Sequence, residues 1–283
     1  MDAMNTETGL PHARAELRER VQHRRRQNVR QKRNRFRLIR LLSFVVVLGA
    51  WQIYGLNSID IIFTPFTTVI AHLYQMLVDG PLVDALVYSV SMFLGGLVIG
   101  SIIGILVGVA MGRFASFEAA VGMYVYAIYS TPLVALIPLI SLWFGFGIEA
   151  QLIIISMFVF FPVTIAVYNG VRSVDASLVE VARSFRASEM EMWQHVIIPS
   201  VVPYIVTGLS QGVAMGLVGM FISEIYTALS GMGQLLAYSA NSYKTADMLA
   251  VLLTVMILGV FFRTVIELMR KRLAPWFNKD TGR

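Results

Sequence analysis

The 283-residue chain contains no cysteine, which excludes disulfide bonds, thiolate metal sites and cysteine nucleophiles. No glycine is followed directly by lysine, so the chain also lacks the P-loop that could hold the phosphates of a nucleotide. Charged residues make up only 14% of the chain, whereas soluble domains carry about a quarter. The four histidines lack metal-ligand spacing, and no metal site is expected. They are His12, His23, His72 and His195.

Apolar sequence dominates instead, with 57% hydrophobic residues and a mean hydropathy of +0.68. Runs of about 20 apolar residues recur, and each is long enough to cross a ~30 Å hydrocarbon core as a helix. The composition therefore predicts an all-α membrane protein with six transmembrane helices. The predicted spans are residues 38–56, 82–111, 119–144, 153–168, 201–222 and 248–268.

The third span contains two prolines, Pro132 and Pro138. Each removes a backbone donor from a helix, and irregular backbone at membrane depth is tolerated only inside a bundle or along a cavity. We therefore expect this span to be broken.

The positive charges predict the orientation of the chain. Twelve Lys and Arg residues lie in Met1–Arg40, and none lies between Leu41 and Gly112. Because cytoplasmic segments carry the excess of cations, both termini are predicted to be cytoplasmic. With six spans, Arg113 and the cations of residues 170–199 fall on the same side, and Lys244 falls outside.

This topology divides the chain into a basic N-terminal arm (1–37), a first transmembrane helix (38–56), a five-helix domain (82–270) and a short tail (271–283). The arm directly precedes a span, where anionic membrane lipid attracts cations. No nucleic-acid-binding module accompanies it, so we expect lipid rather than nucleic acid as its partner.

A polar loop, residues 174–199, interrupts the apolar sequence between the fourth and fifth spans. Asp175 or Ser177 can cap a first helix, and Ser177 with Glu180 has the spacing of a capping box. Ser188 and Glu191 have the same spacing and predict a second helix after a turn at residues 186–187. Pro199 is expected to close that second helix before the fifth span. Two such short helices need a surface to pack on, which is the underside of the bundle, the lipid surface or a partner protein.

The first of these helices presents an apolar stripe. Its members recur at helical spacing and are Leu178, Val181, Ala182 and Phe185.

The loop resembles the EAA loop of ABC importer permeases. Glu180-Val181-Ala182 stands for the EAA triplet, Arg186 stands where that pattern has glycine, and Val196-x-Ile198-Pro199 ends it at the same spacing. The resemblance implies that Glu180, Val181, Ala182, Phe185 and Arg186 form a helix that couples to a separate ATPase, and that Pro199 starts the return to the membrane.

Arginine at the glycine position would cost on the order of 1 kcal/mol if the backbone conformation is kept. Either the turn differs or Arg186 gains a contact.

Further segments are similar to the nitrate, taurine and aliphatic-sulfonate branch of these permeases. They are residues 132–147, Gly170–Asp175 and Ser230-Gly-Met-Gly233. The resemblance implies a type I importer fold and no cofactor on this chain. It also implies three kinds of partner, which are ABC ATPase subunits, an external solute-binding protein and a second copy of the chain. The solute stays open among nitrate, taurine, alkanesulfonates, bicarbonate, pyrimidines and aromatic carboxylates.

Two spans carry glycines four residues apart. Such faces let helices approach closely in lipid, so a packing role is favoured over a solute-lining role. These glycines are Gly96, Gly100, Gly104, Gly108 and Gly112 on the second span, and Gly208, Gly212 and Gly216 on the fifth.

Polar residues inside the apolar spans are candidates for the solute pathway. About half are expected only to bond to their own helix. The candidates are Ser130, Thr131, Ser141, Ser210, Gln211, Ser223 and Glu224. Arg263 and Glu267 lie one helical turn apart in the last span and are predicted to pair with each other.

Two other functions compete with an importer subunit. A channel or secondary transporter would work without a nucleotide, but the expected intramembrane charge relay is missing. An intramembrane serine hydrolase is suggested by Gly208-Leu-Ser210-Gln-Gly212, which matches the nucleophile pattern G-x-S-x-G. That motif needs a preceding strand and a nearby histidine, and neither is predicted here.

Overall fold

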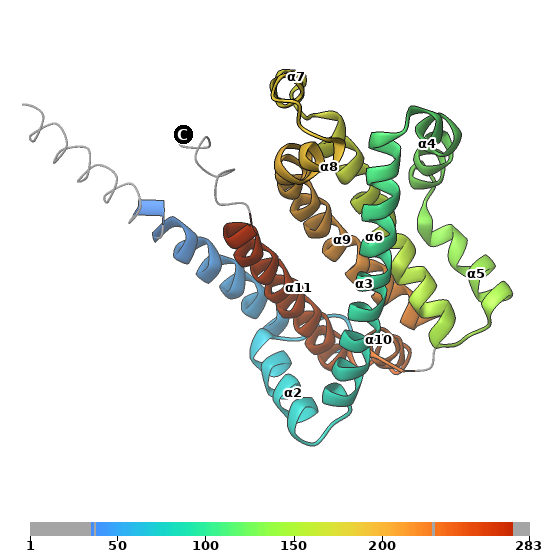
Figure 1. Ribbon diagram of the computed structural model, residues 1–283. Coiled ribbons are helices and arrows are strands. Elements are labelled where there is room, and N and C mark those ends of the chain that lie inside the picture. Colours follow the sequence, from blue (N-terminus) through green and yellow to red (C-terminus); the bar gives the residue numbers. More distant parts are fainter. Residues whose placement is uncertain (1–34, 37, 228–229, 274–283) are drawn as a thin grey trace, which may run out of the picture. The chain divides into compact units, whose positions relative to one another are not determined.

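The computed structural model describes residues 35–36, 38–227 and 230–273. All regular structure in these residues is helical (Figure 1). The chain separates into two units, residues 1–67 and 68–283.

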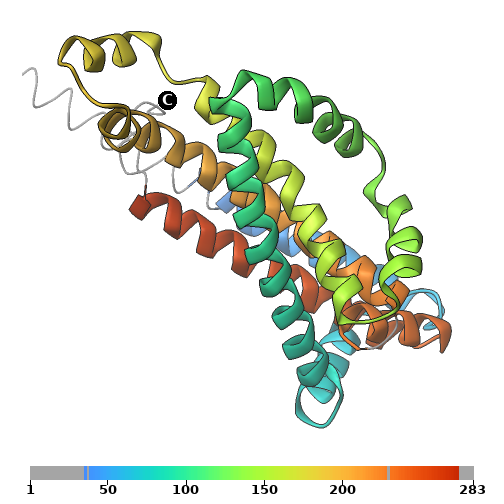
Figure 2. The same cartoon turned by 45° about the vertical axis from the view of Figure 1, so that its right-hand side comes forward.

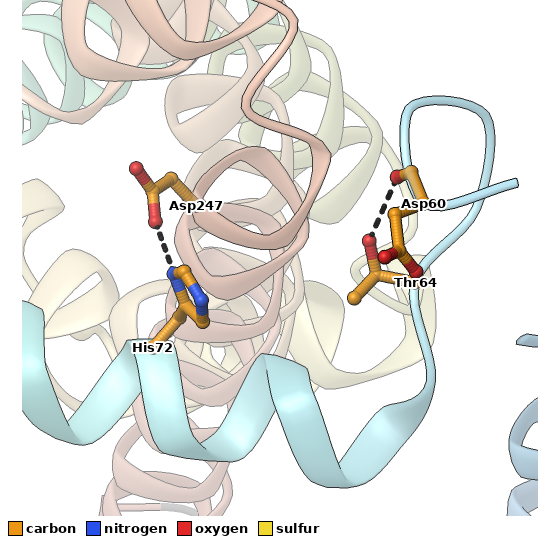
Figure 3. Close-up of polar contacts among 4 residues, drawn as sticks. All are labelled: Asp60, Thr64, His72 and Asp247. Atoms are coloured by element: carbon orange, nitrogen blue, oxygen red, sulfur yellow. Dashed lines mark hydrogen bonds and ion pairs between the residues drawn. The ribbon is translucent and has the colours of Figure 1, made fainter. Parts of the chain in front are cut away.

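The first unit contains the helix Leu38–Leu56 and the turns that follow it. Trp51 Nε1 donates a 3.1 Å hydrogen bond to the carbonyl of Thr64, and the rings of Trp51 and Phe63 lie 5.8 Å apart. The hydroxyl of Thr64 in turn donates to the carbonyl of Asp60 (Figure 3). These contacts fold the segment after the helix back onto its last turns. Residues 1–34 of the predicted basic arm lie outside the described residues.

Three long helices form the centre of the second unit: α3 (Leu82–Arg113), α6 (Ile148–Arg172) and α9 (Ile198–Thr227). They lie side by side in both views (Figures 1 and 2). The middle helix α6 is the most buried of the long helices, with 61% of its apolar window inside the structure. Its valines Val159, Val163 and Val167 form a buried cluster with Val201 of α9.

The glycine faces of α3 and α9 lie in this centre. A Cβ atom at Gly104 would lie 3.0 Å from the carbonyl oxygen of Phe160, and one at Gly108 would lie 2.7 Å from that of Thr164. Gly96, Gly100 and Gly112 likewise face α6, and Gly208, Gly212 and Gly216 face it from α9. The backbones approach one another because no side chains separate them.

The predicted break in the third span is present. Helix α4 (Ala115–Ser130) ends before Pro132, and a 3₁₀ turn (Leu133–Leu136) leads into α5 (Ile137–Phe144), so that the two arms are bent by 97°. Pro138 lies in the first turn of α5, where a missing donor costs nothing. It therefore opens a helix rather than breaking one.

Two shorter helices are not among the predicted spans. Helix α2 (Phe66–Val78) precedes α3, and α10 (Met232–Asn241) precedes the last long helix α11 (Thr245–Leu273). His72 Nδ1 of α2 donates to Asp247 Oδ1 of α11 at 2.7 Å (Figure 3), which ties α2 to the start of the last helix.

Five long helices and the bent pair of α4 and α5 correspond to the six predicted spans, and helical structure extends beyond the predicted ends in all but the first. The largest extension is in the fifth, where helical structure runs without interruption over Glu189–Thr227.

Candidate functional site

The polar loop between α6 and α9 begins with helix α7 (Ala176–Ser184). Its N-cap is Asp175, whose carboxylate accepts a 2.9 Å hydrogen bond from the backbone N–H of Ser177. This bond stabilises the ionised form and lowers the pKa of Asp175 below its ordinary value. Of the two predicted caps, the structure therefore uses Asp175. The capping-box alternative at Ser177 and Glu180 is not formed.

Helix α7 ends at the turn predicted for residues 186–187. Arg186 has φ of 56°, its N–H donates to the carbonyl of Arg183, and the N–H of Ala187 donates to that of Ala182 at 3.1 Å. This pair of bonds is a Schellman motif, in which the residue after the helix adopts the left-handed conformation. The turn is thus the one that glycine favours, and arginine adopts it at a cost. The first alternative for Arg186, a turn that differs from the glycine turn, is therefore wrong. The second alternative was a new contact for its side chain, and none is formed with the described residues.

The second half of the loop is helix α8 (Glu189–Met192) followed by a π-helical turn, Trp193–Ile197. Ser188 and Glu191 form the predicted capping box, with the N–H of Ser188 donating to Glu191 Oε2 at 2.8 Å. The prediction that Pro199 closes this helix is wrong. Pro199 lies in the first turn of α9, and the helical path is uninterrupted. The N–H of Ile198 bonds to the carbonyl of Trp193 five residues back, so the proline follows a turn whose hydrogen bonds are already shifted from the α pattern.

The predicted apolar stripe of α7 faces away from the rest of the unit. Leu178 is 49% exposed, Val181 is 54% exposed and Phe185 is 84% exposed. The opposite side of α7, with Val179, Glu180 and Arg183, lines a cavity of about 370 Å³ against Trp193 and the ends of α3 and α6. The structure thus places Glu180, a predicted coupling residue, on the side that faces the bundle. The loop is also tied to α3 by an ion pair, Arg113 to Glu189 at 3.1 Å. The bundle therefore holds the loop by one face and leaves the apolar face free.

The candidate pathway residues are dispersed. Four hydroxyls donate to carbonyl groups of their own helices, at distances of 2.8 to 3.1 Å, and these are Ser130, Thr131, Ser210 and Ser223. Ser141 is 3% exposed and its hydroxyl has no partner among the described residues. Ser210 and Gln211 line one pocket together. Ser210 lies in the middle of α9 rather than after a strand, so it does not have the geometry of a nucleophile elbow.

Glu224 belongs to the packing of the far end of α9. It is fully buried, and its Oε2 accepts a 2.8 Å hydrogen bond from the N–H of Gly233 at the start of α10. The carboxyl group also fills the space beside Gly231, whose φ is 107°. A side chain on Gly231 or Gly233 would collide with it, so Glu224 fixes the path of the chain into α10.

A buried polar chain beside it was not among the predicted site residues. Tyr88 donates to Gln151 Oε1 at 2.8 Å, and Gln151 Nε2 donates to Thr227 Oγ1 at 2.5 Å. These contacts link α3, α6 and α9. The sequence signal was a glutamine near the start of an apolar span, which by itself does not identify its partners.

The predicted pair of Arg263 and Glu267 is wrong. Glu267 Oε1 instead accepts a 2.7 Å bond from Arg270, three residues further along α11. Arg263 and Glu267 both line the pocket that contains Ser210 and Gln211. Arg263 has no hydrogen bond or ion pair to any of the described residues.

Apolar helices long enough to cross a membrane, together with a helix-turn-helix loop that exposes an apolar face, define a multi-pass membrane protein. Residues 96–279 match the family model of the "Binding-protein-dependent transport system inner membrane component", and the chain belongs to this family.

Relatives of known name agree with this assignment. The chain is 27% identical over 245 residues to a Bacillus subtilis (strain 168) protein named "Putative aliphatic sulfonates transport permease protein SsuC", covering 86% of this chain and 88% of that protein. It is also 27% identical to the taurine transport system permease protein TauC of Escherichia coli (strain K12), over 72% of this chain and 74% of that one.

The fold has solved counterparts. The membrane chain in inward-facing structures of the MetNI methionine ABC transporter matches with a TM-score of 0.58 and 20% identity, over 68% of this chain and 95% of that chain. The protein is therefore a multi-pass permease subunit of an ABC importer, and ATP is hydrolysed by a separate subunit.

Proposed function

We propose that two copies of this chain form the translocation pathway of the importer, and that the loop 174–199 docks on the ATPase at the cytoplasmic face of the membrane. The observation that carries the proposal is the exposed stripe of Leu178, Val181 and Phe185 on a helix that is capped at both ends. A rigid helix that exposes apolar side chains to water is suited to insertion into a groove of a partner. In this assignment Ala182 and Arg186 also contact the ATPase, Glu180 faces the cavity under the loop and positions α7, and Pro199 lies at the return to the membrane.

The distribution of cations supports the cytoplasmic placement of both termini. Arg113 and Arg183 line the cavity under the loop, and Arg172 ends α6 at the same end. Eleven further cations precede the first span and Arg40 lies in its first turn, so the proposed topology gathers the excess of positive charge on one side. The solute then enters from the opposite face, delivered by an external binding protein. The N-terminal arm contacts anionic lipid, and ATP with its Mg²⁺ binds only to the partner ATPase.

A charge in the middle of the docking face tests this assignment. Ala182 lies on α7, and Ala182→Asp places a carboxylate against the partner. The variant is co-expressed with the ATPase and the binding protein and purified through a tag on the permease. We expect recovery of the ATPase to fall at least tenfold, while the size-exclusion profile of the permease is unchanged. Ser184→Ala is the matched control, because its hydroxyl bonds only to the carbonyl of Glu180 in the same helix.

Full recovery of the ATPase with Ala182→Asp would refute the docking role. Solute flux through the purified chain alone in liposomes, without a nucleotide, would favour the channel or secondary transporter instead.

A further inference from the structure

Arg263 is a charged side chain within the membrane-spanning part of α11. It lies ten residues before the end of the helix at Leu273, about 15 Å along the axis. A cation at this depth is costly, and such residues usually face a water-filled cavity or the interior of a bundle. Its nearest acidic neighbour on the helix, Glu267, is already paired with Arg270. The charge of Arg263 is therefore uncompensated within the part of the chain that the structure describes.

The side chain lines a cavity of about 550 Å³ between α9 and α11. The wall from α9 is partly polar, with Thr207, Ser210 and Gln211, and the remainder is apolar. A cavity of this size holds a small organic molecule.

The polar groups of this wall are uncharged, and of them only the amide of Gln211 has N–H groups that are not already donated within α9. The hydroxyls of Thr207 and Ser210 donate to the carbonyls of Pro203 and Val206. The amide of Gln211 has no hydrogen bond to the described residues and is exposed. A guanidinium and a free amide together present several N–H groups to the cavity, which suits a carboxylate, a sulfonate or another oxyanion. The carboxylate of Glu267 at the rim does not offset this, because Arg270 holds it.

We propose that this pocket, the Arg263 pocket, binds the transported solute as an anion, with Arg263 and Gln211 as the residues that contact its oxygen atoms. The inference rests on the proposed function, and it adds a charge class for the solute and a residue that selects it. The same chemistry would also hold the phosphate of an anionic lipid, and the test separates the two.

The absence of cysteine makes a charge-selective labelling experiment possible. Ala214 lines the same pocket and is small, so Ala214→Cys introduces one thiol with little change in volume. The permease, assembled with its ATPase in nanodiscs of phosphatidylcholine, is labelled with a negatively charged sulfonatoethyl methanethiosulfonate and, separately, with a positively charged trimethylammonium methanethiosulfonate. The thiolate attacks the reagent sulfur, a disulfide forms and methanesulfinate leaves.

The expected result is faster labelling by the negative reagent, with a ratio of the two rates that falls about tenfold in Arg263→Gln. Arg263→Lys should keep most of the ratio. Arg270→Gln is the matched control on the same helix, and the ratio should change less, because Arg270 is already paired with Glu267. Ser210→Cys provides a second reporter in the same pocket if Ala214→Cys does not assemble.

A ratio that is the same with and without Arg263, or a thiol that neither reagent reaches from water, would overturn the proposal. Nanodiscs that contain phosphatidylglycerol test the lipid source. If this lipid slows the negative reagent only in the Arg263 chain, lipid phosphate is the occupant and the solute assignment is wrong; an unchanged rate supports a solute site. Co-purification of the ATPase, measured on the same samples, reports on the proposed function separately, so the two ideas can fail independently.

Discussion

The centre of the bundle and the loop 174–199 use the same kinds of residue in opposite ways. In α3, α6 and α9, glycines and valines meet with no space between backbones, and a Cβ at Gly108 would lie 2.7 Å from a carbonyl oxygen of α6. In α7, by contrast, apolar side chains are exposed at the surface of the chain, and Phe185 is 84% exposed. The first region is packed within the single chain, and the second leaves apolar side chains exposed, which we propose contact the ATPase. Changes to the first should therefore alter stability, and changes to the second should alter assembly.

The largest effect is expected from enlarging a central glycine. Gly100→Leu would place a side chain against the backbone of Ser156 and the side chain of Val159, and two packed helices would have to separate. We expect destabilisation on the order of 3 kcal/mol or loss of folded protein, measured by thermal unfolding in detergent.

Gly49→Leu is the control for this change. A Cβ at Gly49 meets nothing within 4 Å, so this glycine of another long helix should accept leucine with no loss of thermal stability. Equal unfolding temperatures for the two variants would show that the glycine faces are not tightly packed.

The next effect should appear in binding rather than in stability. Phe185→Ala removes the most exposed large side chain of α7, and its loss should weaken association with the ATPase by about 30-fold, as for an aromatic anchor worth ~2 kcal/mol. The unfolding temperature should not change. Affinity is measured with the purified ATPase by a surface-binding assay.

Phe146→Ala serves as the comparison, because Phe146 is 66% exposed but lies before α6, at the end away from the loop. A matching loss of affinity in this variant would show that α7 is not the docking helix.

A smaller effect is expected at the turn. Arg186 adopts a positive φ that glycine accepts without strain. Arg186→Gly should therefore stabilise the end of α7 locally by about 1 kcal/mol. The measurement is hydrogen exchange of the backbone amides at positions 186 and 187, which close the Schellman motif and should exchange more slowly in the variant. Faster exchange in the variant would mean that the arginine side chain stabilises the turn by a contact of its own.

The smallest effect should come from the cap of α7. The pKa of Asp175 is lowered in the folded chain, so its contribution is present at neutral pH and is lost as the pH falls through that lowered pKa, below the ordinary value of about 3.9. The N-terminal amides of α7 should exchange faster there, relative to their intrinsic rates.

In Asp175→Ser the hydroxyl cap does not titrate in this range, so this acid-dependent loss should disappear. An identical acid dependence in both chains would assign the change to another group.

The sequence predicted the helices well where periodic apolar runs or local capping determined them. The six spans, the break at Pro132, the turn at Arg186 and the Ser188–Glu191 capping box all depend on residues close to one another in the chain. The prediction that Pro199 closes the second loop helix was wrong because the preceding π-helical turn depends on backbone hydrogen bonds, which the residue pattern does not predict.

The contacts of the polar residues inside the bundle were less predictable, because most of them join residues that are far apart in the chain. Glu267 has cations both four residues before it and three residues after it, and only the fold selects Arg270. Gln151 likewise finds Tyr88 and Thr227 on other helices. Which polar residues meet in one cavity is a property of helix rotation, which apolar periodicity constrains only loosely.

The helix from Glu189 to Thr227 is uninterrupted, so it connects the loop directly to the membrane domain. Its 39 residues span roughly 58 Å, so a rotation of 5° about one end moves the other by roughly 5 Å. A hinge at Pro199 would have absorbed such a rotation locally. If the loop docks as proposed, this continuous helix would carry a small displacement imposed at the ATPase to the opposite end of the bundle, where a movement of roughly 5 Å matches the width of a small molecule.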